Sequence, residues 1–368
     1  MLAVTASAGG NDWMAMLPGD ALVRQLSIPG AHDSATGCGF TESSSFLGSI
    51  AGITQVLTIG EQWDAGVRAF DLRPAYRKED GTVALHHGAL ETSVSLREAL
   101  QTLADKLAAN PEEFAVIVMR HESEGDSNAP EWADAVKTVF DEFDDRLVAF
   151  SGSLSVSQVR GKILVMTRDS FGSAKAGVIS GWSHSEHFAD QQGAVVGLGR
   201  NKAKMFAQDF YECGTAERKI AAVTAMLDYS TANTAATTWV MNNTSGYTGS
   251  IGFNSNITEL ASASNSAMAH YLETSQAGRT GIVMMDFAGA DLNGATRVEG
   301  ARLVDAIIDQ NRRYLDCSAI AEVGVDGMDN DANAAVYNLS GICVAVGSTS
   351  ISSLPAGIYI INGKKIRK

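Results

Sequence analysis

Apolar and helical segments alternate along most of this chain, and this alternation restricts its fold more than any other feature. Seven short, nearly continuous apolar runs indicate strands covered by helices on their faces. They occupy residues 26–30, 67–73, 114–120, 162–167, 204–210, 237–243 and 281–287. Helical patterns lie between or after them, at 95–110, 129–143, 216–230 and 300–315. Repeated β-α units form either an open doubly wound sheet or a closed barrel.

Polar side chains at the ends of these runs favour the barrel. They are His32 and Asp33, Asp71 and Arg73, Arg120, Arg168, Asp209 and Tyr211, Asn242 and Asn243, and Asp286. The carboxyl ends of barrel strands converge on one face, where barrel enzymes place their chemistry. The first run is followed by no glycine-rich phosphate loop of the kind that nucleotide-binding open sheets carry. We therefore predict an α/β fold, a distorted (β/α)8 TIM-type barrel.

The residue composition and the hydrophobic pattern change near the end of the chain. Residues 12–316 hold the β-α alternation, whereas 317–333 are acidic and rich in Gly and Asn, as in a linker. Residues 334–368 alternate short apolar runs with Gly turns and end in basic residues. We predict a catalytic barrel at 12–316, a linker at 317–333 and a small C-terminal β module at 334–368.

Charge and cysteine content exclude several classes of function. The 28 Lys and Arg residues against 42 Asp and Glu residues give a net charge of −14, which argues against a nucleic-acid binder. No run approaches the length of a membrane-spanning helix. The four cysteines contain no C-x-x-C pair, so neither a zinc site nor a disulfide is assigned. We expect no metal, no cofactor and a monomer.

A second motif, VALHHGAL, contains His86 and His87. Two histidines at different strand ends suit cleavage of a phosphodiester by internal attack, since one imidazole removes a proton and the other protonates the departing alkoxide. Carboxylates such as Asp33 would orient the rings. The Arg73 guanidinium would bind the phosphate oxygens, where charge accumulates in the transition state.

The segments LSIPGAHDSATG, GVRAFDLRP, LHHGAL, KILVMTR, QDFY and GIVMMDF resemble, in order, the X-domain motifs of phosphatidylinositol-specific phospholipases C, particularly the secreted bacterial branch. The first three together are the specific signal. The resemblance implies a distorted barrel. It also implies attack by the inositol 2-hydroxyl on phosphorus, giving diacylglycerol and inositol 1,2-cyclic phosphate. The substrate would be phosphatidylinositol or a glycosylated (GPI-type) lipid, met transiently at a membrane surface.

By this resemblance, His32 is the general base supported by Asp286, and His87 is the general acid with Asp33 as its partner. Asp33 is therefore not expected to work with its neighbour His32. Arg73 contacts the phosphate and implies a metal-independent enzyme, because calcium-dependent relatives fill this region with metal ligands. Asp71 holds Arg73 or tunes the acid.

The resemblance also implies an inositol subsite. Arg168, Asp209 and Tyr211 match the arginine, aspartate and stacking tyrosine that bind the ring. Arg120 stands where the family has a lysine, which keeps the charge but changes the geometry. Headgroup detail, including a glycosylated inositol, stays open at this point.

Two groups of apolar residues could form a membrane-facing rim. One comprises Phe46, Leu47 and Ile50, and the other Tyr247, Ile251 and Phe253. We expect both groups to pack inside the fold.

The remaining histidines have ordinary structural interpretations. His86 supports its strand, His121 is a satisfied polar residue near the rim, and His184 and His187 lie in a surface loop.

The tail VYNLSGICV…LPAGIYIINGKK is similar to the C-terminal sorting domains of the type IX secretion system. The start of the chain lacks the charged and apolar regions of a signal peptide. We expect a secreted or cell-surface protein whose leader is absent from this sequence.

Two other functions remain open. One is a non-catalytic barrel that binds inositol or lipid without turnover. The other is a glycerophosphodiester phosphodiesterase, whose usual chemistry needs a metal held by carboxylates.

Overall fold

A computed structural model gives two compact units, Met1–Asn311 and Arg312–Lys368. The structure describes residues 4–6, 10, 12–48, 52–182, 194–199, 203–233, 237–248, 256–275 and 278–311 of the first unit, and residue 312 at the start of the second. In the second it describes 335–338, 343–346, 354, 358–361 and 364–367. The predicted linker, 317–333, lies outside the described residues.

Nine strands of the first unit close into a ring. They are β2 (Ser27–Ala31), β3 (Ala69–Leu72), β7 (Ala115–Met119), β9 (Ile163–Thr167), β10 (Gly177–Ser180), β11 (Ala194–Leu198), β12 (Ala203–Gln208), β13 (Trp239–Asn243) and β14 (Gly281–Met285). Eight of them run parallel, and β11 is antiparallel to both of its neighbours. Pairing of β9 with β10 closes the ring, and β8 (Leu147–Val148) pairs with β9 outside it. The prediction of a distorted α/β barrel is confirmed.

All seven predicted strands are present, and β10 and β11 were missed. The stretch that becomes β10, GVIS, has only two large apolar residues and lies between Gly-rich turns. β11 runs against the β-α order that the sequence suggested. The antiparallel insertion between β10 and β12 is therefore the distortion of the barrel.

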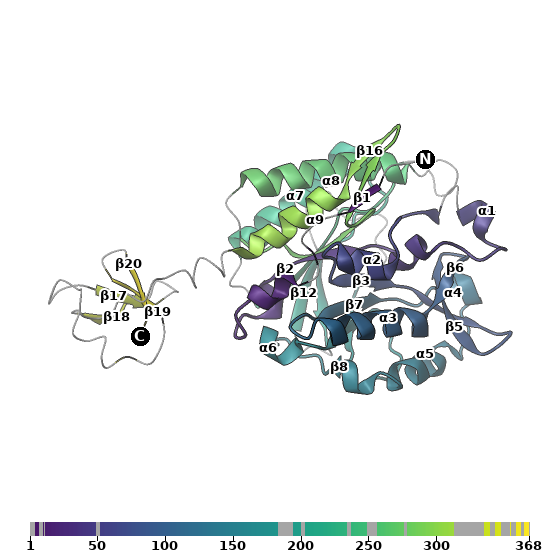
Figure 1. Cartoon of the computed structure of the whole chain (residues 1–368), viewed down its shortest axis with the longest axis horizontal. Coiled ribbons are helices and arrows are strands. Elements are labelled where there is room, and N and C mark those ends of the chain that lie inside the picture. Colours follow the sequence, from purple (N-terminus) through teal and green to yellow (C-terminus); the bar gives the residue numbers. More distant parts are fainter. Residues whose placement is uncertain are drawn as a thin grey trace. The chain divides into compact units, whose positions relative to one another are not determined.

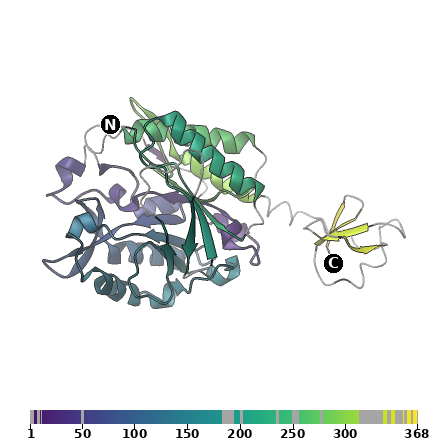
Figure 2. The same cartoon turned by 180° about the vertical axis from the view of Figure 1, so that it is seen from behind.

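Helices surround the strands. They are α1 (Ser45–Leu47), α2 (Ile59–Asp64), α3 (Leu96–Ala109), α4 (Ser123–Asp126), α5 (Trp132–Asp141), α6 (Val156–Val159), α7 (Ala216–Ala232), α8 (Ile257–Thr274) and α9 (Gly300–Asp309). Figure 1 shows α7, α8 and α9 lying together on one side of this unit, with α3 and α5 on another. From behind, the teal strands lie between the green and the blue helices (Figure 2).

The four predicted helices form for the expected reasons. In α3 the N-terminal cap is a reciprocal capping box between Ser95 and Glu98, and the apolar side of the helix is buried. Helix α8 was missed because its sequence is dominated by small and polar residues. Two of these, Ser264 and Asn265, are buried. Asn265 Nδ2 donates to the Asp286 carbonyl at 3.0 Å, so α8 holds the end of β14.

Two small sheets extend the barrel. Strands β4 (Pro74–Arg77), β5 (Thr82–His87) and β6 (Leu90–Ser95) form an antiparallel sheet that follows β3 directly. Strands β1 (Val4–Ala6), β15 (Ala290–Asn293) and β16 (Arg297–Glu299) form the other. The first sheet carries the second histidine motif to the carboxyl end of the barrel.

The second unit contains β17 (Ala335–Asn338), β18 (Cys343–Val346), β19 (Ile358–Ile361) and β20 (Lys364–Arg367). They pair antiparallel in the order β18-β17-β19-β20, as a small β module. Across the described part of the chain, no helix has the length and apolar character needed to cross a bilayer.

A buried ion pair fixes the amino end of the barrel. Arg68 Nε lies 2.8 Å from Glu113 Oε2, and both side chains are fully buried. The Arg68 guanidinium stacks on Trp63, with its carbon 3.9 Å from the ring centroid. Glu113 Oε1 accepts hydrogen bonds from the amides of Met14 (2.7 Å) and Ala15 (3.1 Å). The pair therefore joins the N-terminal segment to β3 and β7.

Replacing Glu113 with Gln should lower the free energy of unfolding by about 3 kcal/mol, because Arg68 would stay buried without a counter-charge. Tryptophan fluorescence during urea unfolding measures this change. The exposed pair of Arg97 and Glu142 offers a control with the same change in net charge. Glu142→Gln should cost less than about 1 kcal/mol. Equal losses in the two variants would contradict a special role for the buried pair.

Candidate active site

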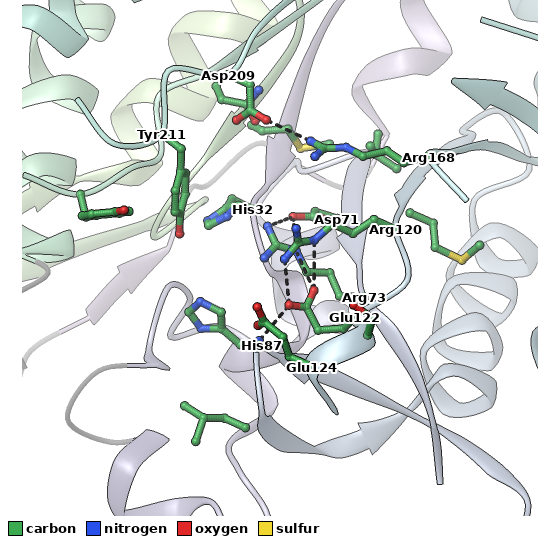
Figure 3. A pocket seen from close by; sticks show the side chains of 18 of the residues that line it. His32, Asp71, Arg73, His87, Arg120, Glu122, Glu124, Arg168, Asp209 and Tyr211 are labelled. Atoms are coloured by element: carbon green, nitrogen blue, oxygen red, sulfur yellow. Dashed lines mark hydrogen bonds and ion pairs between the residues drawn. The ribbon is translucent and has the colours of Figure 1, made fainter. Parts of the chain in front are cut away.

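A cavity of about 630 Å³ opens at the carboxyl ends of the barrel strands. Figure 3 shows that side chains from separate strands point into it. Eight of the ten predicted site residues line it: His32, Asp71, Arg73, His87, Arg120, Arg168, Asp209 and Tyr211. The other two, Asp33 and Asp286, are buried and each lies beside one ring nitrogen of His32. All ten therefore come together, although they span more than 250 residues of sequence.

His32 follows β2 and is 4% exposed. Its Nδ1 lies 2.7 Å from Asp286 Oδ1 at the end of the neighbouring strand β14. A proton on Nδ1 would be held by this carboxylate, leaving Nε2 as the acceptor toward the cavity. Burial by itself lowers the pKa of His32. The carboxylates of Asp286 and Asp33 outweigh it, so that the pKa is raised above its ordinary value.

Asp33 stands between the two histidines. Its Oδ2 is 3.4 Å from His32 Nε2 and 3.5 Å from His87 Nε2. The expected separation of Asp33 from His32 is therefore not seen, because one carboxylate oxygen faces both rings. Asp33 adopts a left-handed backbone conformation (φ 45°), which is uncommon outside glycine. Its amide donates to Asp71 Oδ2 at 3.1 Å, which helps hold the turn.

Arg73 is held by two carboxylates. Its Nε lies 2.8 Å from Asp33 Oδ1, and its Nη2 lies 2.9 Å from Asp71 Oδ2. Burial opposes ionisation of Asp71, but the Arg73 cation holds the pKa of that carboxyl well below its usual range. The pKa of Arg73 is raised in turn, against burial, by Asp33 and Asp71. The Arg73 guanidinium is therefore a fixed positive charge in the site.

His87 reaches the cavity from the β4-β5-β6 sheet. It ends β5, and its Nδ1 lies 2.9 Å from the Gly52 carbonyl. The next residue, Gly88, has a φ of 59°, so the turn needs the freedom of glycine. The Gly88 amide donates to Glu122 Oε1 at 3.0 Å, which fixes the turn after the histidine.

Arg168 and Asp209 form a second charged group in the cavity. Arg168 Nη2 lies 3.1 Å from Asp209 Oδ2, and Trp182 Nε1 donates to the same oxygen at 3.1 Å. The Arg168 guanidinium stacks on Trp182 at 3.8 Å. Burial opposes ionisation of Asp209, but Arg168 lowers its pKa overall. Tyr211 packs edge-on against Tyr247 and lies 5.6 Å from the His32 ring, measured between centroids.

Sequence reasoning missed Glu122. This residue is 2% exposed, and its carboxylate receives a two-point contact from Arg120, at 2.8 and 3.0 Å. Its Oε2 also lies 3.9 Å from Arg73 Nε. The sequence feature that could have identified Glu122 is its position two residues after Arg120, at the end of β7. An Arg and a Glu spaced by two at a strand end can share one cavity wall.

One cluster in the described residues has the composition of a metal site. Ligand atoms of His32, Asp33 and Asp71 all lie within 4.8 Å of one another. The guanidinium of Arg73 lies against both carboxylates of this cluster. It already supplies the positive charge that a metal ion would bring.

The comparisons with known proteins agree with this geometry. Residues 30–169 match the family model for the phosphatidylinositol-specific phospholipase C X domain. This part of the chain is therefore similar to the X domain. The match runs from the end of β2 through β9 and includes His32, Asp33, Asp71, Arg73, His87, Arg120 and Arg168.

Similarity to curated proteins extends over more than half of the chain. The 1-phosphatidylinositol phosphodiesterase of Staphylococcus aureus (strain Newman) is 24% identical over 311 residues, which is 83% of this chain and 96% of the relative. The enzyme of the same name from Listeria monocytogenes is 26% identical over 222 residues, 57% of this chain and 66% of the relative.

Solved structures support the fold. A variant of the phosphatidylinositol-specific phospholipase C from Staphylococcus aureus superposes with a TM-score of 0.68 at 20% identity, covering 82% of this chain and 99% of that one. The Listeria monocytogenes enzyme gives 0.61 at 21% identity, with coverages of 82% and 98%.

The other predicted features have mixed outcomes. Phe46 and Leu47 are 72% and 48% exposed, so the expectation that they pack inside was wrong. Tyr247 is buried, as expected. Ile50, Ile251, Phe253, His184 and His187 lie outside the described residues.

His86 and His121 have structural surroundings. His86 is buried in β5 beside Glu91. His121 Nε2 lies 2.8 Å from Asp126 Oδ2, and its ring stacks on Trp132.

The pKa of His32 should fall when Asp286 is replaced by Asn, because the carboxylate that raises it is lost. NMR titration of the histidine Cε1–H resonances measures this, with His32→Gln assigning the signal. The wild-type pKa should lie above 6.5. Asp134→Asn, on the exposed side of α5, should leave it unchanged. An unchanged His32 titration in Asp286→Asn would show that the 2.7 Å contact does not set its charge.

Proposed function

We propose that this protein is a phosphatidylinositol-specific phospholipase C that needs no metal ion. The observation that carries the proposal is the pair of imidazoles, His32 and His87, that face one cavity from different strands. The Arg73 guanidinium is held in the same cavity by Asp33 and Asp71. Internal transfer at phosphorus needs a base and an acid on opposite sides of the phosphate. The match to the X domain and the names of the relatives support the substrate.

His32 acts as the base. Its Nε2 takes the proton of the inositol 2-hydroxyl as the O2–P bond forms. The resulting imidazolium carries a proton on both nitrogens and is stabilised by Asp286 on one side and Asp33 on the other. The raised pKa of His32 strengthens it as a proton acceptor, and kcat/KM should fall as the pH drops through that value.

His87 acts as the acid. Its Nδ1–H donates to the Gly52 carbonyl, so the proton for transfer lies on Nε2. As the bond between phosphorus and the glycerol oxygen breaks, that proton passes to the oxygen. The products are diacylglycerol and inositol 1,2-cyclic phosphate.

Arg73 stabilises the phosphate. Its guanidinium is fixed by Asp33 and Asp71, so no reorganisation is needed as negative charge accumulates on the non-bridging oxygens. Arg168, Asp209 and Arg120 supply charged hydrogen-bonding groups for the inositol hydroxyls, and Tyr211 supplies a ring face. We propose the same subsite for free and glycosylated phosphatidylinositol.

Replacing His32 or His87 with Ala should each reduce cleavage of phosphatidylinositol by about 100- to 10,000-fold, because each removes one proton transfer. Phosphorus NMR of micellar phosphatidylinositol in excess chelator follows the cyclic product directly. His270→Ala, on the outer helix α8, is the control and should retain full activity.

Three outcomes would contradict this proposal. Inositol binding without turnover in the wild type would favour a non-catalytic barrel. Activity that chelator abolishes and a divalent cation restores would favour the metal-dependent glycerophosphodiester reaction. Full activity in His32→Ala would reject the assigned base.

We also propose that α1 contacts the membrane. Phe46 and Leu47 are neighbours and both exposed, and Ile53, further along the same segment, is 37% exposed. Gly52, the carbonyl partner of His87, precedes Ile53. These three exposed apolar residues are therefore close in sequence to Gly52, which contacts the active site. With a net charge of −14, contact with lipid should be apolar rather than ionic.

Replacing Phe46 and Leu47 together with Ser should weaken binding to phosphatidylcholine vesicles about tenfold, since their apolar area would no longer enter the bilayer. A sedimentation assay measures the bound fraction. Met16 is 44% exposed and belongs to the segment bonded to Glu113 at the amino end of the barrel, so Met16→Ser is the matched control. Equal binding by wild type and the double variant would exclude α1 as the contact.

Secretion, a monomeric state and export through the C-terminal module remain proposals that follow from the sequence. An enzyme that acts on membrane lipid as a peripheral protein is consistent with a secreted or cell-surface location.

A further inference from the structure

A lysine lies fully buried behind the cavity wall. Lys219 belongs to the first turn of α7 and is 0% exposed. Its Nζ donates to the Phe210 carbonyl at 2.9 Å and contacts Gln208 Oε1 at 3.4 Å. A buried ammonium is costly unless it is paired and hydrogen-bonded, so a solvated surface position would be the usual one. Lys219 takes no part in the proposed proton transfers.

The partners of Lys219 define the turn that carries the inositol subsite. Gln208 ends β12 and accepts from the Phe210 amide at 2.7 Å. The amide and the carbonyl of Phe210 are therefore both bound, one by Gln208 and the other by Lys219. Asp209 and Tyr211, the two residues that flank Phe210, are the ones that line the cavity.

The same turn is tied to the next strand. Gln208 Nε2 donates to Asn242 Oδ1 at 2.7 Å and to the Asn243 carbonyl at 2.9 Å. Asn243 Nδ2 donates back to the Gln208 carbonyl at 2.7 Å. Lys219 contributes the one positive charge among these buried groups, which otherwise consist of neutral amides.

We infer that the Lys219 ammonium is a positioning residue that holds the Asp209–Tyr211 turn in the shape that binds a polyol headgroup. It acts through the Phe210 carbonyl and through its field on the Asp209 carboxylate. This inference rests on the proposed function, because it assigns the headgroup subsite of the same enzyme.

The charge on Lys219 also makes the subsite sensitive to pH. The described groups that act on it are Asp209, Cys213 and Asp286. Burial outweighs their effect and lowers the pKa of Lys219 to about 8. Burial raises the pKa of the Cys213 thiol and of Tyr211, so neither loses its proton near pH 8. Headgroup affinity should therefore fall as the pH rises through about 8.

Lys219→Met keeps the volume of the side chain and removes its charge. Titration calorimetry with myo-inositol should give a dissociation constant about tenfold higher at pH 7, with kcat for phosphatidylinositol within about threefold of the wild type. Wild-type affinity should weaken between pH 7.5 and 9, and this decline should be absent in Lys219→Met. Lys137→Met, which breaks only an exposed pair with Asp141, is the charge-matched control.

A second measurement reads the turn without any ligand. Trp182 donates to Asp209 Oδ2, so its fluorescence, obtained by difference from Trp182→Phe, should titrate near pH 8 in the wild type only. A lower Tm with wild-type affinity and an unchanged pH profile would reduce Lys219 to a structural role and overturn the inference. If the wild-type protein neither binds inositol nor cleaves phosphatidylinositol, the proposed function is rejected. The fluorescence titration would then still decide whether Lys219 controls the turn.

Discussion

The active site depends on one largely shielded cation, the Arg73 guanidinium, whose side chain is 12% exposed. Arg73 lies between Asp33 and Asp71. Without it, these two carboxylates would lie close together beside the imidazoles of His32 and His87, with no positive charge to balance them. Two neighbouring carboxyl groups do not both ionise easily in a low-dielectric site. Without the guanidinium, at least one of them would be protonated and would no longer orient the neighbouring histidine. With Arg73 in place, Asp71 stays ionised, accepts the Asp33 amide and holds that residue in its left-handed conformation. The direction of the Asp33 carboxylate, and through it the relation of the two histidines, follows from this ion pair.

Barrel closure supplies the second constraint. Neighbouring parallel strands bring residues from opposite ends of the sequence into register, so that β14 lies beside β2 and Asp286 meets His32. A layer of buried amides and one lysine then sets the turns that leave the strands, as Gln208, Asn242 and Lys219 do after β12. The chemistry of the cavity is therefore carried by polar groups in two layers. One layer faces the cavity, and the other lies behind it and never touches substrate.

Much of this arrangement was predictable because its signals are local. Apolar runs with polar ends identified seven strands and, through convergence in a barrel, most of the predicted site residues, whereas His87 came from the separate motif VALHHGAL. The parts that were missed depend on tertiary contacts. β10 and β11 have short or weak patterns, and only pairing with β9 and β12 makes them strands. Glu122 was missed because its contact with the Gly88 amide, from a distant strand end, depends on the tertiary fold. The exposure of Phe46 could not be predicted, because apolar residues on a short helix give the same sequence pattern whether they face a core or a bilayer.

The position of Asp33 between both imidazoles gives the proposed reaction a constant charge. In the proposed reaction His87 carries the transferable proton before attack, and the Asp33 carboxylate oxygen lies 3.5 Å from its Nε2. Once His32 has taken the proton of the attacking hydroxyl, the same oxygen lies 3.4 Å from the protonated Nε2 of His32. The group of three side chains holds the same net charge at both ends of the step. Near-equal distances from one carboxylate oxygen mean that charge can move across the phosphate without rearranging the protein. Asp33 is thus better understood as shared by both histidines than as the partner of His87 alone.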